Sequence, residues 1–440
     1  MSCAKLYRVL VWGLACLVWA CSNAAPPLPQ KSPEEVDPQG QTVVFWYQHT
    51  RERETALLEM IGEFNQGNPY GIQVKGEYAG NYSYIYNKML VGLQGGSLPQ
   101  LVVAYQNQAQ VYYSADGVVD LEPYLNSPKW GFPPEVRADY IENFLDQDRV
   151  RGKLLAFPPN RSLEILYYNI DWLKELGADH PPKSWDEFAQ LCRQAKAHPF
   201  SKAANPQRSL GYLLDMDASR LASMVFSRGG DFINPAQSEY NFVRPETKTA
   251  LQLLVDLKRE GAIDVLTETN GDTKEFGAGQ LLFAIGSSSG LPFYKKAVNS
   301  GSKFSWGVAA VPCDGEHPIL NVYGASVALC RTRAEQQLAG WLFLKWFTEP
   351  AQQARWVKAS GYFPVRRSTA ADLQGYFAEN PNYQAAFALL DYGKTEPTAP
   401  GYETVRRLIQ NAMADAMDGM ALDPLLARLT KAANATLEPE

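Results

Sequence analysis

The chain has 440 residues, which at roughly 100–200 residues per domain predicts two domains or two lobes. Its 41 Lys and Arg residues face 47 Asp and Glu residues, so the net charge is −6 and the basic excess typical of nucleic-acid binding is lacking. With 46% hydrophobic and 20% charged residues, the composition is that of a globular protein and not of a disordered one. The four histidines are scattered, so we expect neither a histidine-based metal centre nor a cofactor.

The first residues have the layout of a secretory signal. Basic residues precede an apolar run at 9–20, which is too short to cross a bilayer because a spanning helix needs about 20 residues. A small residue followed by Cys21 resembles a bacterial lipoprotein signal, and ordinary cleavage near Ala24 is the alternative. We therefore expect residues 1–21 to be a signal peptide and residues 22–40 to be a flexible tether. The mature chain would lie outside the cytoplasm, anchored to a membrane by a lipid on Cys21.

Strand and helix patterns alternate after the tether. Residues 42–47 are rich in β-formers, and residues 51–66 carry apolar side chains at helical spacing. Strand patterns at 71–78 and 99–104 flank a helical pattern at 82–95. This β-α-β-α-β order predicts a parallel sheet with helices on both faces, and ligands of such sheets bind beyond the carboxyl ends of the strands. Polar and aromatic residues gather at the three predicted strand ends, at 46–48, 80–82 and 105–107.

A second series of elements begins near residue 154. We expect strands at 163–168, 281–285, 305–311 and 322–329, helices at 170–176 and 333–347, and helical structure over 402–437.

The cysteines beyond the signal region suggest no metal or redox site. Cys192 falls in a helical pattern and Cys330 ends an apolar strand pattern, as is typical of buried small side chains. Their spacing fits neither a zinc site nor a redox pair, and it leaves a disulfide between Cys313 and Cys330 open.

Residues 286–290 fit the G-x-S-x-G pattern of a hydrolase nucleophile, with Ser288 at its centre. Such an enzyme also needs an acid and a histidine, and the chain offers only Asp314 and His317 after the pattern, close behind it. A turn rich in Ser and Gly can also bind an anion through hydroxyls and backbone N–H groups, or simply cap a helix. No phosphate-binding loop and no H-E-x-x-H motif occurs.

Several stretches together resemble the extracellular solute-binding proteins of ABC importers, in the cluster that takes up sugars and glycerol phosphates. They are FNQGNPYGIQV, LEILYYNIDWLKELGADHPPKSWDEF, FGAGQLLFAIGSSSG, YGASVAL and GYFPVRRS, and the similarity covers about residues 42–430. The likeness is greatest to members that bind sn-glycerol 3-phosphate.

The resemblance implies an α/β fold of two lobes, the type II arrangement of periplasmic binding proteins, with a hinge between the lobes. It places residues 41–160 and 328–363 in an N-terminal lobe, and residues 161–322 and 364–440 in a C-terminal lobe. It implies ligand capture without catalysis, closure of the lobes on the ligand, and delivery to the membrane permease of an ABC importer by a monomeric protein.

The resemblance also implies seven ligand-binding positions. They are Tyr82 after a Gly-Asn pair, Gln106 where the family has an acidic residue, Ser162 before the Tyr-Tyr-Asn strand, Ser288 in the Ser-Ser-Gly turn, Gly324 of Gly-Ala-Ser, Tyr362 of Gly-Tyr-Phe-Pro, and Arg406 on a helix. The family's glycerol-3-phosphate binders carry two Trp after a Gly-Tyr pair, whereas LLDMDASR follows Gly211-Tyr212 in this chain.

The expected function is therefore capture of sn-glycerol 3-phosphate or a glycerophosphodiester. Binding of a sugar or oligosaccharide by the same fold is the first alternative, and a serine hydrolase using Ser288 is the second. Ser162, Ser288, the amide of Gly324 and Arg406 would supply donors to a phosphate, and the charged one forms the strongest hydrogen bonds.

Overall fold

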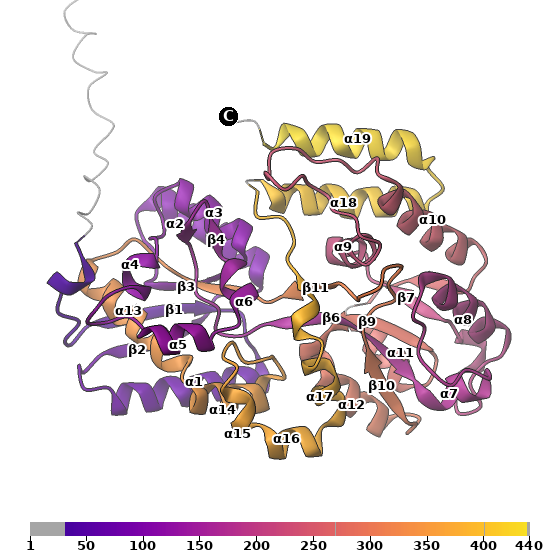
Figure 1. Ribbon diagram of the computed structural model, residues 1–440, viewed down its shortest axis with the longest axis horizontal. Helices are drawn as coiled ribbons and strands as arrows, with labels where there is room; N and C mark the ends of the chain where they lie inside the picture. Colours follow the sequence, from indigo (N-terminus) through magenta and orange to yellow (C-terminus); the bar gives the residue numbers. More distant parts are fainter. Residues whose placement is uncertain (1–30, 269, 400, 438–440) are drawn as a thin grey trace, which may run out of the picture. The chain divides into compact units, whose positions relative to one another are not determined.

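Figure 1 shows the computed structural model, which describes residues 31–268, 270–399 and 401–437. From Ser32 onward the chain forms one compact unit. The expected signal peptide, Cys21 and the first part of the expected tether lie outside the described residues. The last part of that tether differs from the expectation: Pro33 and Val36 are buried, and the Trp130 Nε1–H donates to the Pro33 carbonyl over 3.0 Å.

The first sheet has four strands in the order β12-β3-β1-β2. The strands β1, β2 and β3 are parallel, as predicted, and β12 joins them antiparallel. Their bounds are β1 (Thr42–Tyr47), β2 (Gln73–Tyr78), β3 (Leu101–Ala104) and β12 (Ser326–Leu329). Every residue of β3 and β12 is buried, which matches the continuous apolar runs from which these strands form.

Helices cover both faces of this sheet, α2 and α3 on one side and α1 and α14 on the other in Figure 1. The helix α13 packs on β1, where the Phe45 and Phe343 ring centroids are 6.1 Å apart. The helices of this part of the chain are α1 (Arg51–Gly67), α2 (Tyr82–Gly95), α3 (Gln106–Ser114), α4 (Glu122–Leu125), α5 (Pro134–Asp139), α6 (Glu142–Asp146), α13 (Ala334–Phe347) and α14 (Pro350–Ser360). A small hairpin pairs β4 (Arg149–Val150) with β5 (Lys153–Leu154).

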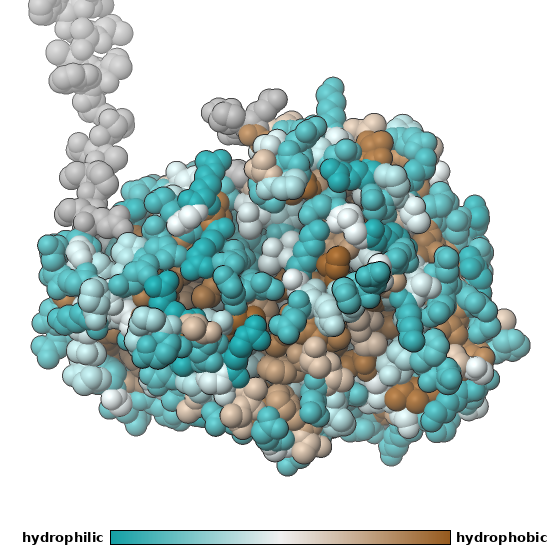
Figure 2. Space-filling view, viewed as in Figure 1, coloured by the Kyte–Doolittle hydropathy of each residue, from teal (hydrophilic) through white to brown (hydrophobic). Residues whose placement is uncertain are grey.

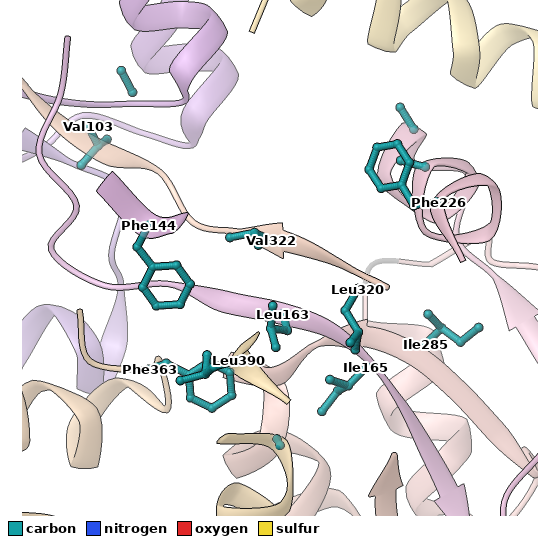
Figure 3. Close-up of a cluster of buried hydrophobic side chains, with 14 of the residues drawn as sticks. Val103, Phe144, Leu163, Ile165, Phe226, Ile285, Leu320, Val322, Phe363 and Leu390 are labelled. Carbon is teal, nitrogen blue, oxygen red and sulfur yellow. The ribbon is translucent and has the colours of Figure 1, made fainter. Parts of the chain in front are cut away.

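The second sheet is built around β6, a long strand whose first six residues are all buried (Figure 3). It runs in the order β10-β6-β11-β13, and β9 also pairs with β6. The strands are β6 (Ser162–Asn169), β9 (Phe283–Ser287), β10 (Trp306–Ala309), β11 (Leu320–Tyr323) and β13 (Gly393–Lys394). In Figure 3 the apolar side chains of β6 and β11, among them Leu163, Ile165, Leu320 and Val322, gather with Phe363 and Leu390.

Helices also surround the second sheet, and α18 and α19 pack side by side at the C-terminal end of the chain (Figure 1). The predicted helical stretch 402–437 is therefore two helices, which separate at Gly419 with a φ of +92°. The helices are α7 (Ile170–Glu175), α8 (Trp185–Ala197), α9 (Ala218–Phe226), α10 (Pro245–Arg259), α11 (Gly271–Gly277), α12 (Leu291–Ser300), α15 (Thr369–Asp372), α16 (Gln374–Glu379), α17 (Pro381–Phe387), α18 (Tyr402–Met417) and α19 (Leu422–Ala435). A separate pair joins β7 (Tyr212–Leu214) to β8 (Ile263–Val265).

The prediction of one strand at 322–329 is wrong, because Gly324 breaks it into β11 and β12, which belong to different sheets. Gly324 has a φ of +125°, a conformation that side chains with a Cβ rarely adopt. A Cβ at this position would lie 3.2 Å from the Asn160 carbonyl oxygen, so the glycine also permits the close approach of a neighbouring segment.

Segments that connect the two sheets meet beside Gly324. Arg161 and Phe363 exchange both backbone hydrogen bonds, at 3.2 and 2.7 Å. The fully buried Arg161 guanidinium pairs with Asp148 over 2.6 Å and also donates to the Ser326 hydroxyl over 2.7 Å. A buried pair of this kind depends on both partners, because either charge alone would be uncompensated. The assignment of residues to two lobes, with boundaries near these segments, stays a prediction.

Among the described residues, Cys192, Cys313 and Cys330 are all free, so the structure contains no Cys313–Cys330 disulfide. No helix in the described ranges has the length and apolar character to cross a membrane. The face in Figure 2 is mainly hydrophilic, with hydrophobic residues scattered over it.

Candidate ligand-binding site

A cavity of about 290 Å³ lies between residues of the two sheet regions. Five uncharged residues from the first region form what we call the neutral wall: Tyr82, Tyr105, Gln106, Asn107 and Gln147. Five charged residues from the second region form the charged wall: Asp215, Asp217, Arg220, Glu396 and Arg406. A third group, the hydroxyl cluster, consists of Ser162, Ser287, Ser289 and Tyr362, and Gly324 lines the cavity beside it.

The structure brings six of the seven predicted ligand-binding residues to this cavity. They are Tyr82, Gln106, Ser162, Gly324, Tyr362 and Arg406, from positions as far apart as residues 82 and 406. That each of them contacts a ligand stays a prediction.

Ser288 is the exception and does not line the cavity. Its side chain is fully buried, and its Oγ accepts a hydrogen bond from the Leu163 backbone N–H over 3.1 Å. The strand β9 ends at Ser287, and the following 3₁₀ turn, η3 (Ser288–Gly290), directs Ser288 into the core. Ser287 and Ser289 line the cavity in its place, with their Oγ atoms 2.9 Å apart.

The same geometry gives no support to a hydrolase that uses Ser288. A nucleophile must be reachable by substrate and must lie beside its base. Ser288 is buried, whereas His317, the histidine downstream of it, is exposed on a loop.

Arg406, on the first turns of α18, is the centre of the charged wall. Its guanidinium donates to Asp217 over 2.9 Å, to the Ser219 hydroxyl over 3.0 Å and to Glu396. Burial alone would lower the pKa of Arg406, but Glu396 and Asp217 outweigh it and hold the pKa well above its usual value. Arg406, the charged donor expected for a phosphate, is therefore already paired with two carboxylates.

Glu396 is almost completely buried and remains ionised because its partners compensate the burial. Burial would raise its pKa, but Arg406 and hydrogen bonds from Ser219, Asn321 and Tyr402 lower it below the usual range. The Tyr402 hydroxyl donates to Glu396 over 2.7 Å, and the Asn321 side-chain amide donates over 2.8 Å. Such a network fixes the orientation of both charges.

Arg220, on the first turn of α9, is the second cation of the charged wall. It pairs with the fully buried Glu164 of β6, and its Nη2 lies 3.7 Å from the nearer Asp215 oxygen. Burial, together with the negative charges of Asp217 and Asp272, raises the pKa of Asp215 to about 6. Asp215 can therefore change charge near neutral pH.

The charged wall comes largely from a segment that the sequence analysis singled out only for its missing Trp pair. Asp215, Asp217 and Arg220 all belong to LLDMDASR, which starts in β7 and continues into α9. Asp217 also caps α9 by accepting from the Ser219 N–H over 2.8 Å, which places it beside Arg406. The absence of the family's Trp pair in this segment was therefore the feature of the sequence that could have pointed to these three residues.

The neutral wall is held mainly by contacts between uncharged groups, and the Asn107 side-chain amide also donates to the Glu403 carboxylate over 3.0 Å. The Tyr82 and Tyr105 ring centroids are 4.8 Å apart, and the Gln48 side-chain amide donates to the Tyr82 hydroxyl over 2.8 Å. Burial raises the pKa of Tyr82 and of Tyr105, so both hydroxyls stay protonated at neutral pH. Tyr105 also begins α3, which brings Gln106 to the cavity.

Arg53, near the start of α1, lies behind the hydroxyl cluster. It donates to the Ser289 carbonyl over 2.8 Å and to the Ser360 carbonyl over 2.9 Å, and its guanidinium carbon is 4.9 Å from the centre of the Tyr362 ring. In the described part of the chain no carboxylate lies within 4.0 Å of it, so its charge is not paired. The Arg53 guanidinium therefore places a positive charge beside the hydroxyl cluster. The charged wall, in contrast, is rich in carboxylates.

The described residues contain no group of three or more His, Cys, Asp or Glu side chains arranged to hold a metal ion. The site is thus a set of hydroxyls, amides, phenol rings and paired charges, which suits reversible binding of a polar solute.

Residues 59–386 match the family of bacterial extracellular solute-binding proteins. The chain belongs to this family. It is a solute-binding protein of an ABC importer, and its family is one of substrate-binding proteins and not of enzymes. The expectation drawn from the sequence resemblance is therefore confirmed at the level of the family.

Curated relatives of this solute-binding protein include the sn-glycerol-3-phosphate-binding periplasmic proteins of Salmonella typhimurium and Escherichia coli K12. Each is 24% identical to this chain, in alignments that cover 78% of this chain and 79% of the relative.

Solved structures confirm the α/β fold of two lobes. The sugar-binding protein MalE of Xanthomonas citri has a TM-score of 0.77 at 20% identity and covers 90% of this chain and 97% of its own. UgpB of Mycobacterium tuberculosis, solved with glycerophosphocholine, has a TM-score of 0.75 at 21% identity and covers 90% and 98%. At these identities the similarity establishes the fold of this solute-binding protein. The identity of its ligand has to be inferred from the residues that line the cavity.

Proposed function

We propose that this chain captures a glycerophosphodiester whose head group carries a cation, so that the ligand has no net charge. The charge balance of the cavity carries this proposal. Two guanidinium groups, Arg220 and Arg406, face four carboxylates: Asp215, Asp217, Glu396 and the buried Glu164. A further dianion, such as sn-glycerol 3-phosphate, would add negative charge to a region that already has an excess of it.

The hydroxyl cluster is the proposed position of the phosphodiester. The Ser287 hydroxyl donates to the Ser162 hydroxyl over 2.9 Å and lies 2.9 Å from that of Ser289, so the three groups are close enough to share one anion. Arg53, bound to the Ser289 carbonyl, adds a positive charge behind them. Because a diester has a single negative charge, this modest donor set is sufficient, whereas a phosphate monoester carries between one and two charges at neutral pH.

The charged wall is the proposed position of the cationic head group. Asp215 is about half exposed and has only a long contact to Arg220, so it is the carboxylate with most capacity for a new partner. Tyrosine rings on the lining, Tyr105 and Tyr323 among them, can add cation–π attraction to an ammonium. The mycobacterial UgpB solved with glycerophosphocholine has the same fold, which supports such a ligand without deciding it.

A neutral sugar is the second candidate, and one observation favours it. Both cavity arginines are already paired with carboxylates, so an uncharged ligand leaves the balance unchanged, and the Tyr82–Tyr105 pair offers ring faces to a sugar. The cavity of about 290 Å³ lies at the small end of the usual range of roughly 300–1,000 Å³, which argues against a long oligosaccharide.

The remaining parts of the proposed function concern delivery. We infer that the mature protein is held outside the cytoplasm by a lipid on Cys21, that it works as a monomer without catalysing a reaction, and that the two lobes close on the ligand before a permease receives it. The contacts of Arg161, Phe363 and Gly324 between the connecting segments support a hinge at that place.

The test is calorimetric titration of the purified mature protein with glycerophosphocholine, sn-glycerol 3-phosphate and maltose. We expect glycerophosphocholine to bind at least tenfold more tightly than sn-glycerol 3-phosphate, which corresponds to about 1.4 kcal/mol. Tighter binding of sn-glycerol 3-phosphate would contradict the charge argument. Binding of maltose alone would favour the sugar, and binding of none of the three would refute the proposal.

A further inference from the structure

Gln147 was not among the residues expected from the sequence, yet it lines the cavity and is only 3% exposed. It follows the short helix α6 and precedes Asp148, whose carboxylate pairs with the buried Arg161 guanidinium over 2.6 Å. The backbone at Gln147 is therefore held in place beside the segments that connect the two sheets.

The side-chain amide of Gln147 is only partly satisfied. Its Nε2 donates to Gln106 Oε1 over 3.2 Å, and its Oε1 is buried with no partner among the described residues. A buried acceptor without a partner costs free energy, which a donor arriving with a ligand would recover. With both amides turned over, the pair still leaves one oxygen and one NH₂ group free.

We infer that Gln147 is a specificity-determining residue that binds an alcohol group of the ligand against the neutral wall. A hydroxyl both donates and accepts, so it matches the free oxygen and the free NH₂ group that the two glutamines leave. An ammonium or a carboxylate matches only one of them, and it would be buried against a wall without a compensating charge. The inference rests on the proposed function, because it assumes that a polar solute occupies the cavity.

Gln110 provides a matched control on the same part of the chain. It lies on α3, one turn after Gln106, is 7% exposed, and also has a buried Oε1 without a partner among the described residues. It does not line the cavity. If unpaired glutamine oxygens affect the protein in general, substitution of either residue should have the same effect. If Gln147 contacts the ligand, only its substitution should change the affinity.

The experiment compares Gln147→Leu and Gln110→Leu by calorimetry with two probes, glycerophosphocholine and an analogue in which a propyl group replaces the glycerol. Gln147→Leu is expected to weaken binding of glycerophosphocholine about tenfold, the effect of one lost hydrogen bond of this kind, and to leave binding of the propyl analogue unchanged. Gln110→Leu should change neither affinity. If the protein binds maltose instead, maltose and its deoxy analogues replace the two probes. Gln147→Leu should then weaken binding of maltose and leave binding of the analogue that lacks the contacted hydroxyl unchanged.

Thermal unfolding of the ligand-free variants separates recognition from a structural role. Gln147→Leu removes the unpaired oxygen but also leaves the buried Gln106 Oε1 without its donor, so the two effects offset each other and the melting temperature is expected to stay close to that of the wild type. Equal weakening of both probes together with a lower melting temperature would make Gln147 structural and overturn the inference. If Gln147→Leu binds glycerophosphocholine or maltose as tightly as the wild type does, the inference on Gln147 is wrong and the proposed function stands. If the wild-type protein binds none of the probes, the proposed function is wrong, and the inference falls with it.

Discussion

The two walls of the cavity are built on different physical principles. The neutral wall consists of uncharged amides and phenols, in which a 3.2 Å hydrogen bond joins Gln147 to Gln106 and Asn107 donates to the Glu403 carboxylate. The charged wall consists of ion pairs, in which Arg406 holds both Asp217 and Glu396. The neutral wall can lose one member with local effects, whereas the charged wall is a network in which each charge compensates another.

This difference separates the tasks that the walls can perform. Paired charges have fixed orientations and create a directed field before any ligand arrives, so they discriminate by the sign of a charge. Uncharged amides discriminate by the number and direction of hydrogen bonds, because an unmatched polar group stays desolvated. We expect the charged wall to select the charge of the ligand and the neutral wall to select its hydroxyl pattern.

The largest effect should follow removal of the central cation of the charged wall. Arg406→Ala leaves Glu396, only 6% exposed, without its main compensating charge, and breaking a buried pair costs about 3–5 kcal/mol. Urea unfolding monitored by circular dichroism should show this loss. The double variant Arg406→Ala/Glu396→Gln should recover part of it.

The control for this prediction is Arg407→Ala, the next residue on α18, which is exposed and donates to Thr404. Its free energy of unfolding should change by less than about 0.5 kcal/mol. An Arg406→Ala protein as stable as this control would mean that the charged wall is not a network.

The sequence predicts the architecture of this cavity better than its charges. The alternation of strand and helix patterns over residues 42–104 correctly predicts the parallel strands β1, β2 and β3, because local periodicity determines such elements. The single strand predicted at 322–329 was wrong, since an apolar run does not reveal that Gly324 adopts a φ of +125°.

The charged wall could not be read from the sequence because its partners are distant along the chain. Arg406 pairs with Asp217, 189 residues earlier, and no local pattern indicates that meeting. The three serines at 287–289 show the same limit on a smaller scale. Their identity predicts a polar turn, but only the turn geometry decides which hydroxyls reach the cavity.

The second prediction concerns the serine turn and tests whether Ser289 faces the cavity while Ser288 belongs to the core. Ser288→Ala leaves the buried Leu163 N–H without its acceptor, so we expect a loss of about 1–3 kcal/mol in the free energy of unfolding and an unchanged ligand affinity. Ser289→Ala should do the opposite, with nearly unchanged stability and a several-fold weaker binding of glycerophosphocholine. Weaker binding by the Ser288 variant alone would return Ser288 to the ligand-binding set.

The smallest effect concerns the protonation of Asp215, and it tests whether the charged wall selects a cation. The pKa of Asp215 is raised to about 6 by burial and by Asp217 and Asp272, so the carboxylate is ionised at pH 7.5 and largely neutral at pH 5. Affinity for glycerophosphocholine should therefore be highest above pH 6 and fall about tenfold by pH 5, because the neutral acid no longer attracts the ammonium. For sn-glycerol 3-phosphate the wall becomes less repulsive at low pH, so the opposite sign is expected.

The variant Asp215→Asn isolates this group. It should remove the pH dependence for glycerophosphocholine and bind it at pH 7.5 about as weakly as the wild type does at pH 5. Its stability should move the other way: a carboxyl whose pKa is raised on folding destabilises the native state once it ionises, so the uncharged amide should stabilise the ligand-free protein at pH 7.5. A variant that is more stable and still loses affinity at low pH would show that another group carries the titration, and the charge selectivity of this wall would then have to be assigned to Arg220 and its partners.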